Sequence, residues 1–336
     1  SASLTGLFRS TDQGANWTAL DVPATGGQGF VHFGIAADAV AENFVYVRGQ
    51  APGMFRVDAS LTSGNQITTL TGGVSGTPHV DTREITLDAN NDLIDVNDGG
   101  IYRRLSPSSP TGVWESVIGN LGVMELHDVA YDSVSDIIIA GTQDNGTQIQ
   151  MSTGNLVWDH ISGGDGGDVL VDDVSLAGSG QSIRYFSSQN LGGFRSQVFD
   201  AANNPVGGST VIDTSVVSDA QFKTPLELNA IDPQRFVIGG SSNVYESLDM
   251  GATITNISAG VAGTNRPGAL AYGGRRLSVD NPDVVYTGDG SQVFLRTTAG
   301  GVFTATSALP VGVDMIRDIE LDPDDWFTAY VVDSNQ

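Results

Sequence analysis

Aspartates in glycine-containing segments are the residues of this sequence best suited to binding a metal. Asp98 precedes a Gly-Gly pair, Asp144 precedes an Asn-Gly pair, and Asp165 and Asp168 belong to the glycine-rich segment 163–168. Carboxylate oxygens on flexible turns suit a hard cation such as Ca²⁺, which takes about 6 to 8 oxygen ligands. The alternative is that Asp98 and Asp144 accept backbone N–H groups of their own turns. The sequence leaves both interpretations open.

A second set of polar residues stands five positions before an aspartate that recurs along the chain. Its charged or titratable members are Arg83, His127, Glu227, Arg275 and Arg317. Guanidinium groups that converge from separate repeats would bind the carboxylate of an acidic sugar or of a peptide terminus. In the second account, the arginines pair with neighbouring acids and form an ion network: Glu84, Asp128 and Asp318. The first account predicts a ligand-binding cluster.

These residues are placed by a repeat that runs through the whole chain. Each copy is a four-residue run that ends in aspartate, and these aspartates lie 40 to 60 residues apart: Asp38, Asp88, Asp132, Asp172, Asp232, Asp280 and Asp322. A second and a third apolar run follow most copies after polar turns. Strand–turn–strand repeats of this length are typical of four-stranded propeller blades. The repeat therefore predicts an all-β protein, a seven-bladed β-propeller with four-stranded blades.

The seventh repeat is split between the two ends of the sequence. After residues 315–336 the third run is missing, and a matching run stands at Leu7–Arg9. We therefore expect one domain over residues 1–336, closed by a blade that residues 1–21 and 315–336 share, which removes an exposed sheet edge. An open β-solenoid is the structural alternative.

One motif resembles a known family. Ser10 to Trp17 reads S-x-D-x-G-x-x-W, and Ser247 to Ile254 is a degenerate copy. In such a turn the aspartate accepts backbone N–H groups and the glycine takes a positive φ. The pattern is similar to the Asp-box (BNR-repeat) β-propellers of secreted bacterial proteins, which include sialidases, xyloglucanase-type glycosidases and sortilin-type receptors. The resemblance implies the fold; its motifs belong to the scaffold and are shared by enzymes and binding proteins.

Composition excludes several classes of partner and site. The chain has 15 Lys and Arg against 39 Asp and Glu, a formal net charge of −24, and no cysteine. Such a surface repels nucleic acid and anionic lipid and favours cationic partners. Thiolate chemistry and disulfides are impossible, and no apolar stretch is long enough to predict membrane insertion. We expect a secreted or cell-surface protein, with flanking domains of a longer precursor.

The leading functional prediction is a non-catalytic β-propeller that binds a glycan or protein ligand at the mouth of its channel, with Ca²⁺ assisting. The alternative is a glycoside hydrolase or lyase that acts on an acidic polysaccharide and clamps its carboxylate with the arginine cluster, as the resemblance to sialidases implies. His32, His79 and His127 also leave a histidine metal site or a histidine-based lyase open.

Overall fold

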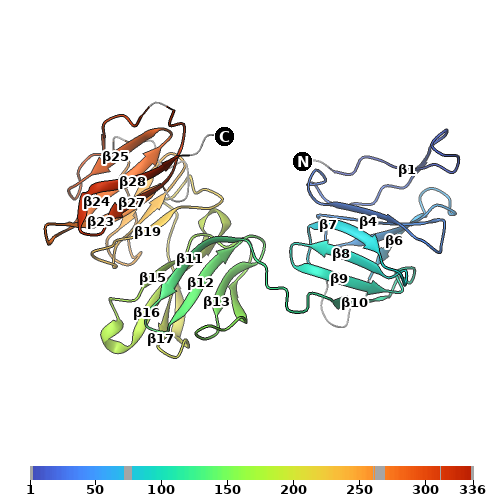
Figure 1. The fold of residues 1–336 in the computed structure, drawn as a ribbon, viewed down its shortest axis with the longest axis horizontal. Coiled ribbons are helices and arrows are strands. Elements are labelled where there is room, and N and C mark those ends of the chain that lie inside the picture. Colours follow the sequence, from blue (N-terminus) through green and yellow to red (C-terminus); the bar gives the residue numbers. More distant parts are fainter. Residues whose placement is uncertain (1–2, 72–77, 260, 262–268, 311, 334–336) are drawn as a thin grey trace. The chain divides into compact units, whose positions relative to one another are not determined.

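The computed structural model describes residues 3–71, 78–259, 261, 269–310 and 312–333. The chain forms two compact units, unit 1 up to Gly122 and unit 2 from Val123 onward (Figure 1). Both consist of β-strands joined by turns, so the predicted all-β class is confirmed. Two short 3₁₀ turns, η1 (Ala177–Ser179) and η2 (Gln189–Leu191), are the helical elements of the described residues, and neither could cross a membrane.

Unit 1 contains one two-stranded and two four-stranded antiparallel sheets. The two-stranded sheet pairs β1 (Leu7–Arg9) with β2 (Thr18–Leu20). The strands of the four-stranded sheets are β3 (Phe33–Ala37), β4 (Phe44–Gly49), β5 (Met54–Asp58), β6 (Ile67–Leu70), and β7 (Thr82–Leu87), β8 (Leu93–Asn97), β9 (Gly100–Leu105), β10 (Val113–Ser116).

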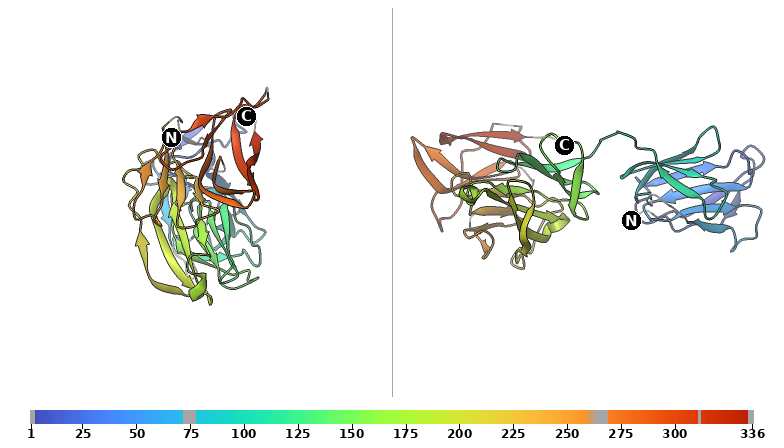
Figure 2. Two further views of the ribbon diagram at one scale, coloured as in Figure 1. Left: turned by 90° about the vertical axis from the view of Figure 1, so that its left-hand side faces the viewer. Right: turned by 90° about the horizontal axis from the view of Figure 1, so that it is seen from below.

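Unit 2 contains four further groups of four strands, which Figure 2 shows in colours from green through yellow toward red. They are β11 (Leu126–Asp132), β12 (Ile137–Thr142), β13 (Gly146–Gln150), β14 (Trp158–Ser162); β15 (Leu170–Asp172), β16 (Gln181–Ser188), β17 (Gly192–Asp200), β18 (Pro205–Val211); β19 (Leu226–Leu228), β20 (Phe236–Gly239), β21 (Val244–Ser247), β22 (Thr255–Asn256); and β23 (Leu270–Arg276), β24 (Val279–Asp289), β25 (Gln292–Arg296), β26 (Thr304–Ala305). A hairpin of β27 (Ile316–Asp322) and β28 (Asp325–Asp333) follows.

Each four-stranded group is an up-and-down meander, in which every strand pairs with the next one in sequence. The first strand of each group therefore lies at one edge of its sheet and the fourth at the other. The hairpin β27–β28 joins the sheet of β23 through a single residue pair, Arg276 with Asp325, so that this sheet has six strands. Four-stranded antiparallel meanders are what a propeller blade requires.

The repeated aspartate closes the first strand of a blade by capping the turn after it. Asp132 Oδ1 accepts the N–H groups of Val134 and Ser135 at 2.9 and 3.4 Å. Asp172 Oδ1 does the same for Val174 and Ser175 at 3.1 and 2.8 Å. A short carboxylate or amide that bonds to backbone two and three residues ahead stabilises such a turn. The repeat is therefore a folding signal.

Two copies of the repeat differ in structure from the predicted alignment. In the third blade of unit 2, Asn229 caps the turn through the N–H groups of Ile231 and Asp232, both at 2.9 Å, so Asp232 lies beyond the strand end. In the fourth blade, β23 turns directly into β24 at Leu277 and Ser278, whose φ angles are 50° and 62°. Two successive positive φ angles are typical of a type I′ hairpin turn, which needs no aspartate cap. Both differences change the level at which Glu227 and Arg275 lie on their strands.

Aromatic rings and buried ion pairs hold neighbouring blades together. In unit 2, Tyr185, Phe194 and Phe236 pack ring against ring with centroids 5.6 to 6.3 Å apart. The Arg184 guanidinium and the Asp132 carboxylate, both fully buried, pair between adjacent blades at 2.6 Å. These contacts join the first three four-stranded groups of unit 2.

The two copies of the S-x-D-x-G turn have the same geometry. Asp12 Oδ1 accepts the N–H of Asn16 at 2.8 Å, and Asp249 Oδ1 accepts the N–H of Thr253 at 2.8 Å. Trp17, at the end of the first copy, lies at the surface with 65% of its area exposed. The hydrogen bonds agree with a structural role of the aspartates.

Candidate binding site

Three of the inner strands of unit 2, and the segment that leads into a fourth, bring acidic side chains into one cavity. Asp128 on β11, Asp168 before β15 and Asp318 on β27 each stand four residues before the aspartate that caps the following turn. Their equivalent positions place them at one level of these strands. They line a cavity of about 390 Å³ together with His127, Val129, Val169, Leu170, Pro225, Leu226, Glu227 and Leu270. We call this space the upper cavity.

Asp168 is the most deeply buried acid of the upper cavity, with 7% of its surface exposed. Its Oδ2 accepts the N–H of Leu226 at 3.1 Å. Burial, followed by the charge of Asp128, raises the pKa of Asp168 to about 8, although the Leu226 amide and Lys223 act in the opposite direction. Burial also raises the pKa of Asp128, against hydrogen bonds that its carboxylate accepts from backbone N–H groups. Asp168 is therefore largely protonated at neutral pH.

Glu227 on β19 lies between the upper cavity and a second one. Burial, and then the negative charges of Glu320, Asp128, Asp168 and Asp318, raise the pKa of Glu227 to about 8. Apart from burial, every one of these causes is another carboxylate. A cation among these groups would relieve their mutual repulsion.

The second cavity, which we call the lower cavity, has a volume of about 250 Å³. Four charged residues line it, Glu227, Arg275, Glu320 and Asp322, together with apolar residues and glycines of the neighbouring strands and turns. Arg275 pairs with Asp280 across the β23–β24 hairpin, from Nε to Oδ1 at 2.6 Å. Glu227 and Arg275 both line the lower cavity because each stands two residues before the turn that ends its strand. The predicted alignment had placed them five residues before it. Arg275 is therefore not at the level of Arg317, which stands five residues before Asp322.

His127 on β11 links the upper cavity to two of the predicted metal ligands. Its Nδ1 lies 2.6 Å from the carbonyl oxygen of Gly166, and its Nε2 lies 2.9 Å from Oε1 of Gln143. The Gln143 side-chain N–H₂ donates to Asp144 at 3.0 Å and to Asp165. Asp144 and Asp165 are thus neighbours that a glutamine bridges, whereas Asp168 faces the upper cavity. A metal site made of Asp98, Asp144, Asp165 and Asp168 remains a prediction.

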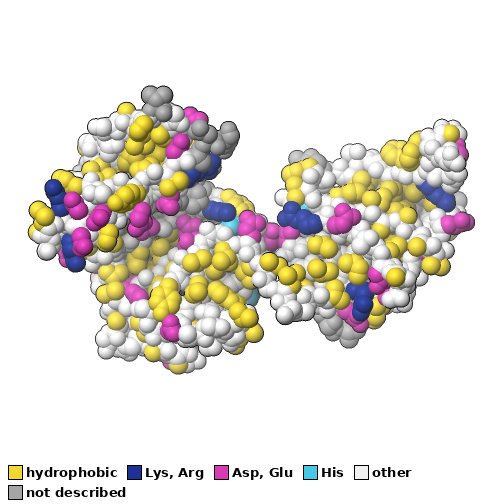
Figure 3. All heavy atoms as spheres, in the orientation of Figure 1, with side chains coloured by type: hydrophobic (Ala, Val, Ile, Leu, Met, Phe, Trp, Pro, Cys, Tyr) yellow, Lys and Arg dark blue, Asp and Glu magenta, His cyan; other side chains and the backbone are white. Residues whose placement is uncertain are grey.

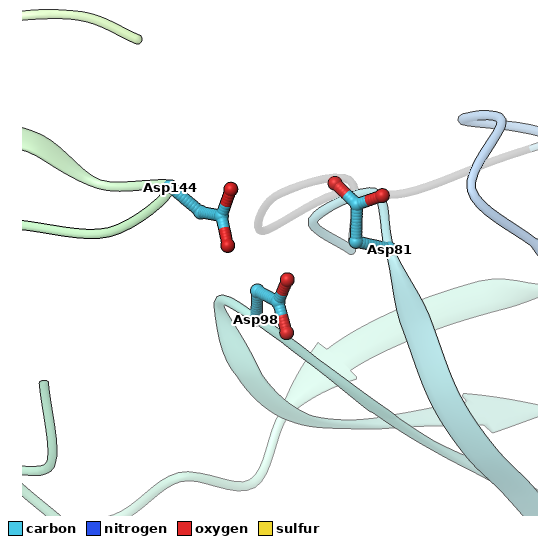
Figure 4. Close-up of side chains that lie close together, drawn as sticks. All are labelled: Asp81, Asp98 and Asp144. Carbon is cyan, nitrogen blue, oxygen red and sulfur yellow. The ribbon is translucent and has the colours of Figure 1, made fainter. Parts of the chain in front are cut away.

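The remaining predicted residues lie in unit 1. Arg83 on β7 forms a two-pronged ion pair with Asp98, whose turn joins β8 to β9, at 2.7 and 3.0 Å. One carboxylate oxygen of Asp98 also lies within 4.8 Å of one of Asp81, and both side chains are drawn in Figure 4. Arg83 therefore pairs with an acid from the adjacent strand turn and not with Glu84. A cluster of Arg83 with Arg275 and Arg317 remains a prediction.

Sequence reasoning missed Glu320 and did not assign Asp128 or Asp318 to a ligand site. The usable signal was the side-chain alternation of a strand, by which positions two residues apart face the same side. On β27, Asp318 and Glu320 have this spacing and line the upper and lower cavity, respectively.

Among the charged side chains visible on unit 2 in Figure 3, Asp and Glu cover more of the surface than Lys and Arg do. This agrees with the net charge of −24. The geometry is that of an acidic space between inner strands, in which two carboxyl groups hold their protons at neutral pH.

Comparison with known proteins gives the fold but no family. No family model and no curated protein matches the chain. Among solved structures, a GH74 enzyme of Niastella koreensis is similar over 96% of this chain and 47% of its own, with 16% identity and a TM-score of 0.53. The chain thus spans about half the length of that enzyme. Sqt1 of Chaetomium thermophilum matches 87% of this chain and 75% of its own, with 13% identity and a TM-score of 0.41. The first likeness supports a β-propeller fold.

Proposed function

We propose that this protein is a propeller-type binding module that takes a positively charged group of a protein or glycan ligand into the upper cavity of unit 2. The observation that carries the proposal is the set of acids around that cavity, Asp128, Asp168, Glu227 and Asp318, of which Asp168 and Glu227 have a pKa of about 8. A cavity with convergent titratable groups of perturbed pKa is the default place to expect a ligand.

An ammonium or guanidinium group fits this cavity because it would neutralise carboxyl groups that repel one another. Binding would favour the ionised forms of Asp168 and Glu227 and so release protons. The affinity for the cation should therefore rise with pH as these carboxyls approach their pKa of about 8. The net charge of −24 would also attract a cationic ligand from a distance. In this proposal the protein acts at the cell surface or after secretion, within a longer precursor.

We also propose that the chain closes as seven blades, with residues 1–21 and 315–336 sharing the last. Support comes from each unit separately. In unit 1, β1 and β2 form half a blade, and Phe8 is 58% exposed. In unit 2, β27 and β28 form the other half, and Tyr330 is 62% exposed. Two half-blades with exposed aromatic residues would complete one four-stranded sheet and remove both edges.

The closure can be tested because the chain has no cysteine of its own. Phe8→Cys would be combined in turn with single cysteines at positions 328 to 332 on β28. We expect at least one pair to form an intramolecular disulfide in the native monomer, since paired strands bring Cβ atoms within about 4.5 to 5.5 Å. If every pair stays reduced, or only intermolecular dimers form, the shared blade is refuted.

The binding proposal is tested by isothermal titration calorimetry with defined probes. Hexalysine serves as a cationic peptide and a glucosamine hexamer as a cationic glycan, with hexaglutamate and an N-acetylglucosamine hexamer as matched probes that lack the positive charge. We expect one of the cationic probes to bind, and we expect Asp168→Asn with Glu227→Gln to weaken it at least tenfold. Glu125→Gln, at an exposed position before β11, is the control. Equal binding to the double variant, or no binding of either cationic probe, contradicts the proposal.

A second candidate function is glycoside hydrolysis, which one observation favours. Glu227 keeps a proton at neutral pH and shares the cavity with other carboxyl groups, as a general acid with a partner base would. The carboxylate clamp of this alternative has weaker support, since Arg275 is already paired with Asp280. Hydrolysis of any oligosaccharide in a neutral and acidic panel that disappears in Glu227→Gln, but not in Glu125→Gln, would favour the enzyme.

A further inference from the structure

Another cavity of unit 2 lies between the sheet β11–β14 and the sheet β15–β18. Its volume is about 400 Å³, and strands β13, β14, β16, β17 and β18 line it together with residues beside them. We call this space the side groove. Among the described residues, it shares no lining residue with the upper or the lower cavity. It is therefore a separate candidate site.

One wall of the side groove is a face of the sheet β15–β18. Arg195, Gln197 and Phe199 of β17 line it, and side chains two positions apart on a strand face the same side. Phe186 on β16 stands opposite Arg195 in the strand register and shares that face. Phe186 and Phe199 are buried, with 4% and 6% of their surface exposed. The two rings therefore give the side groove an apolar floor.

The opposite wall belongs to the sheet β11–β14. Ile149 on β13 and Ile161 on β14 give it apolar surface. Asp159 stands opposite Ile149 in the strand register, so its carboxylate belongs to the same wall. Asp159 and Arg195 are the charged residues that line the side groove, and among the described residues no ion pair joins them. The side groove thus has one negative and one positive group on facing walls.

Two contacts hold the Arg195 guanidinium against its own sheet. Its Nε donates to the carbonyl oxygen of Gly193 at 2.9 Å, and its central carbon lies 6.0 Å from the centroid of the Phe186 ring. Neither contact neutralises the charge. In the part of the chain that the structure describes, no carboxylate forms an ion pair with Arg195.

The equivalent arginine of unit 1 does have an acidic partner. Arg103 on β9 and Arg195 on β17 both stand three residues after the glycine that begins the third strand of their sheet. Arg103 stands opposite Glu115 of β10 and donates to its Oε2 at 2.9 Å. Arg195 stands opposite Val211 of β18. Valine in place of the cross-strand acid leaves Arg195 with a charge that a ligand can neutralise.

We propose that the side groove binds a small monocarboxylate with an apolar body. The guanidinium of Arg195 donates to the carboxylate, a pairing that its planar geometry favours. The body of the ligand covers Phe186 and Phe199 and so leaves water. Asp159 on the opposite wall repels a second negative charge. A concave space of this volume, with an apolar floor and a few polar groups, is typical of sites for small ligands.

This site goes beyond the proposed function, because it takes an anionic group and the upper cavity takes a cationic one. The two proposals can therefore fail separately.

The test is an NMR titration of the full chain with 3-phenylpropionate. The backbone amides of Arg195, Gln197 and Phe199 report the side groove, and those of Asp168 and Glu227 report the upper cavity. We expect the first set to shift and to saturate, and the second set to stay in place. 3-Phenylpropanamide lacks the charge and acetate lacks the apolar body, so each should bind at least about tenfold more weakly. Phenylsuccinate, which carries a second carboxylate, should also bind more weakly than 3-phenylpropionate.

Three variants separate recognition of the carboxylate from a general loss of structure. Arg195→Gln should weaken the binding of 3-phenylpropionate at least about tenfold, because it removes the positive charge. Arg195→Lys keeps that charge and should lose less affinity. Arg103→Gln, at the equivalent position of unit 1, should bind as wild type does.

Four results would overturn the inference. They are no saturable shift of the side-groove amides with 3-phenylpropionate, equal affinity for 3-phenylpropanamide, unchanged binding in Arg195→Gln, and an equal loss in Arg195→Gln and Arg195→Lys. Binding of phenylsuccinate as tight as that of 3-phenylpropionate would refute the limit to one carboxylate that Asp159 sets.

Discussion

Glu227→Gln should make the protein more stable in alkaline solution and leave it unchanged in acid. The folded protein raises the pKa of Glu227 from 4.5 to about 8, first through burial and then through neighbouring carboxylates. Between these two values the folded state binds more protons than the unfolded state does. Stability must then fall as the pH rises through this window. Glutamine has no ionisable group, so the stability of the variant should not fall in this pH window for this reason.

The size of the effect follows from the shift. One pKa unit corresponds to about 1.36 kcal/mol, so the full shift sets an upper bound of about 5 kcal/mol. Glu227 borders two cavities, and access of solvent reduces this to roughly 2 kcal/mol. For a unit of this size, such a gain raises the melting temperature by roughly 4 to 8 °C.

Thermal melts of wild type and Glu227→Gln at pH 5 and pH 9 provide the assay. We expect equal melting temperatures at pH 5 and the higher value for the variant at pH 9. Glu125→Gln removes the same charge at an exposed position and should follow wild type within about 1 °C. Parallel pH profiles for wild type and Glu227→Gln, or a variant that is less stable at pH 9, would refute the reasoning.

Three further predictions concern other parts of the molecule. Arg184→Met should lower the free energy of unfolding, measured in urea, by about 3 to 5 kcal/mol, because Asp132 stays buried without its partner. Adding Asp132→Asn should restore part of the lost stability, whereas losses that simply add would contradict the pairing. Asp249→Ala should lower the free energy of unfolding by about 1 to 2 kcal/mol, because it removes two hydrogen bonds from Thr253, and Asp249→Asn should lower it by less. An alanine variant as stable as wild type would contradict the structural role. If Ca²⁺ binds near Asp168, Ca²⁺ at 100 times its Kd should stabilise the folded state by about 2.7 kcal/mol and so raise the melting temperature, and a chelator should cancel the rise. An unchanged melting temperature would contradict the calcium prediction.

Much of the fold could be predicted because the blade repeat is a local signal. A strand, a capped turn and the next strand recur within each repeat, and capping by Asp132 or Asp172 depends on residues two and three positions ahead. The confirmed part is the all-β class with four-stranded antiparallel sheets. The number of blades and their closure involve residues from opposite ends of the chain and remain predictions.

The site was harder to predict because its alignment depends on the turn that ends each first strand. Asn229 replaces aspartate as a cap, and the Leu277–Ser278 turn has none. Counting back from Asp232 and Asp280 therefore placed Glu227 and Arg275 at the wrong level. The amide of asparagine makes the same short-range hydrogen bonds as a carboxylate, so the error was invisible in a pattern that required aspartate.

Ion-pair partners were the least predictable feature. Arg83 pairs with Asp98, fifteen positions away, and Arg275 pairs with Asp280 across a hairpin. The expected partners in the ion network were Glu84, Asp128 and Asp318, of which Glu84 is adjacent to Arg83 in the sequence. Neighbouring residues on a strand point to opposite faces, so an adjacent acid is poorly placed to pair. Partner choice depends on strand pairing, which composition does not reveal.

The most direct test of the central claim is the number of protons released when a cationic probe binds. Titrating hexalysine, or the glucosamine hexamer, into wild type at pH 7.5 in two buffers of different ionisation enthalpy gives that number. We predict a net release that Asp168→Asn with Glu227→Gln abolishes together with most of the affinity, since both carboxyls are largely protonated before the ligand arrives. Binding without proton release, or equal release from the double variant, would show that the acidic cavity of unit 2 is not where the ligand binds.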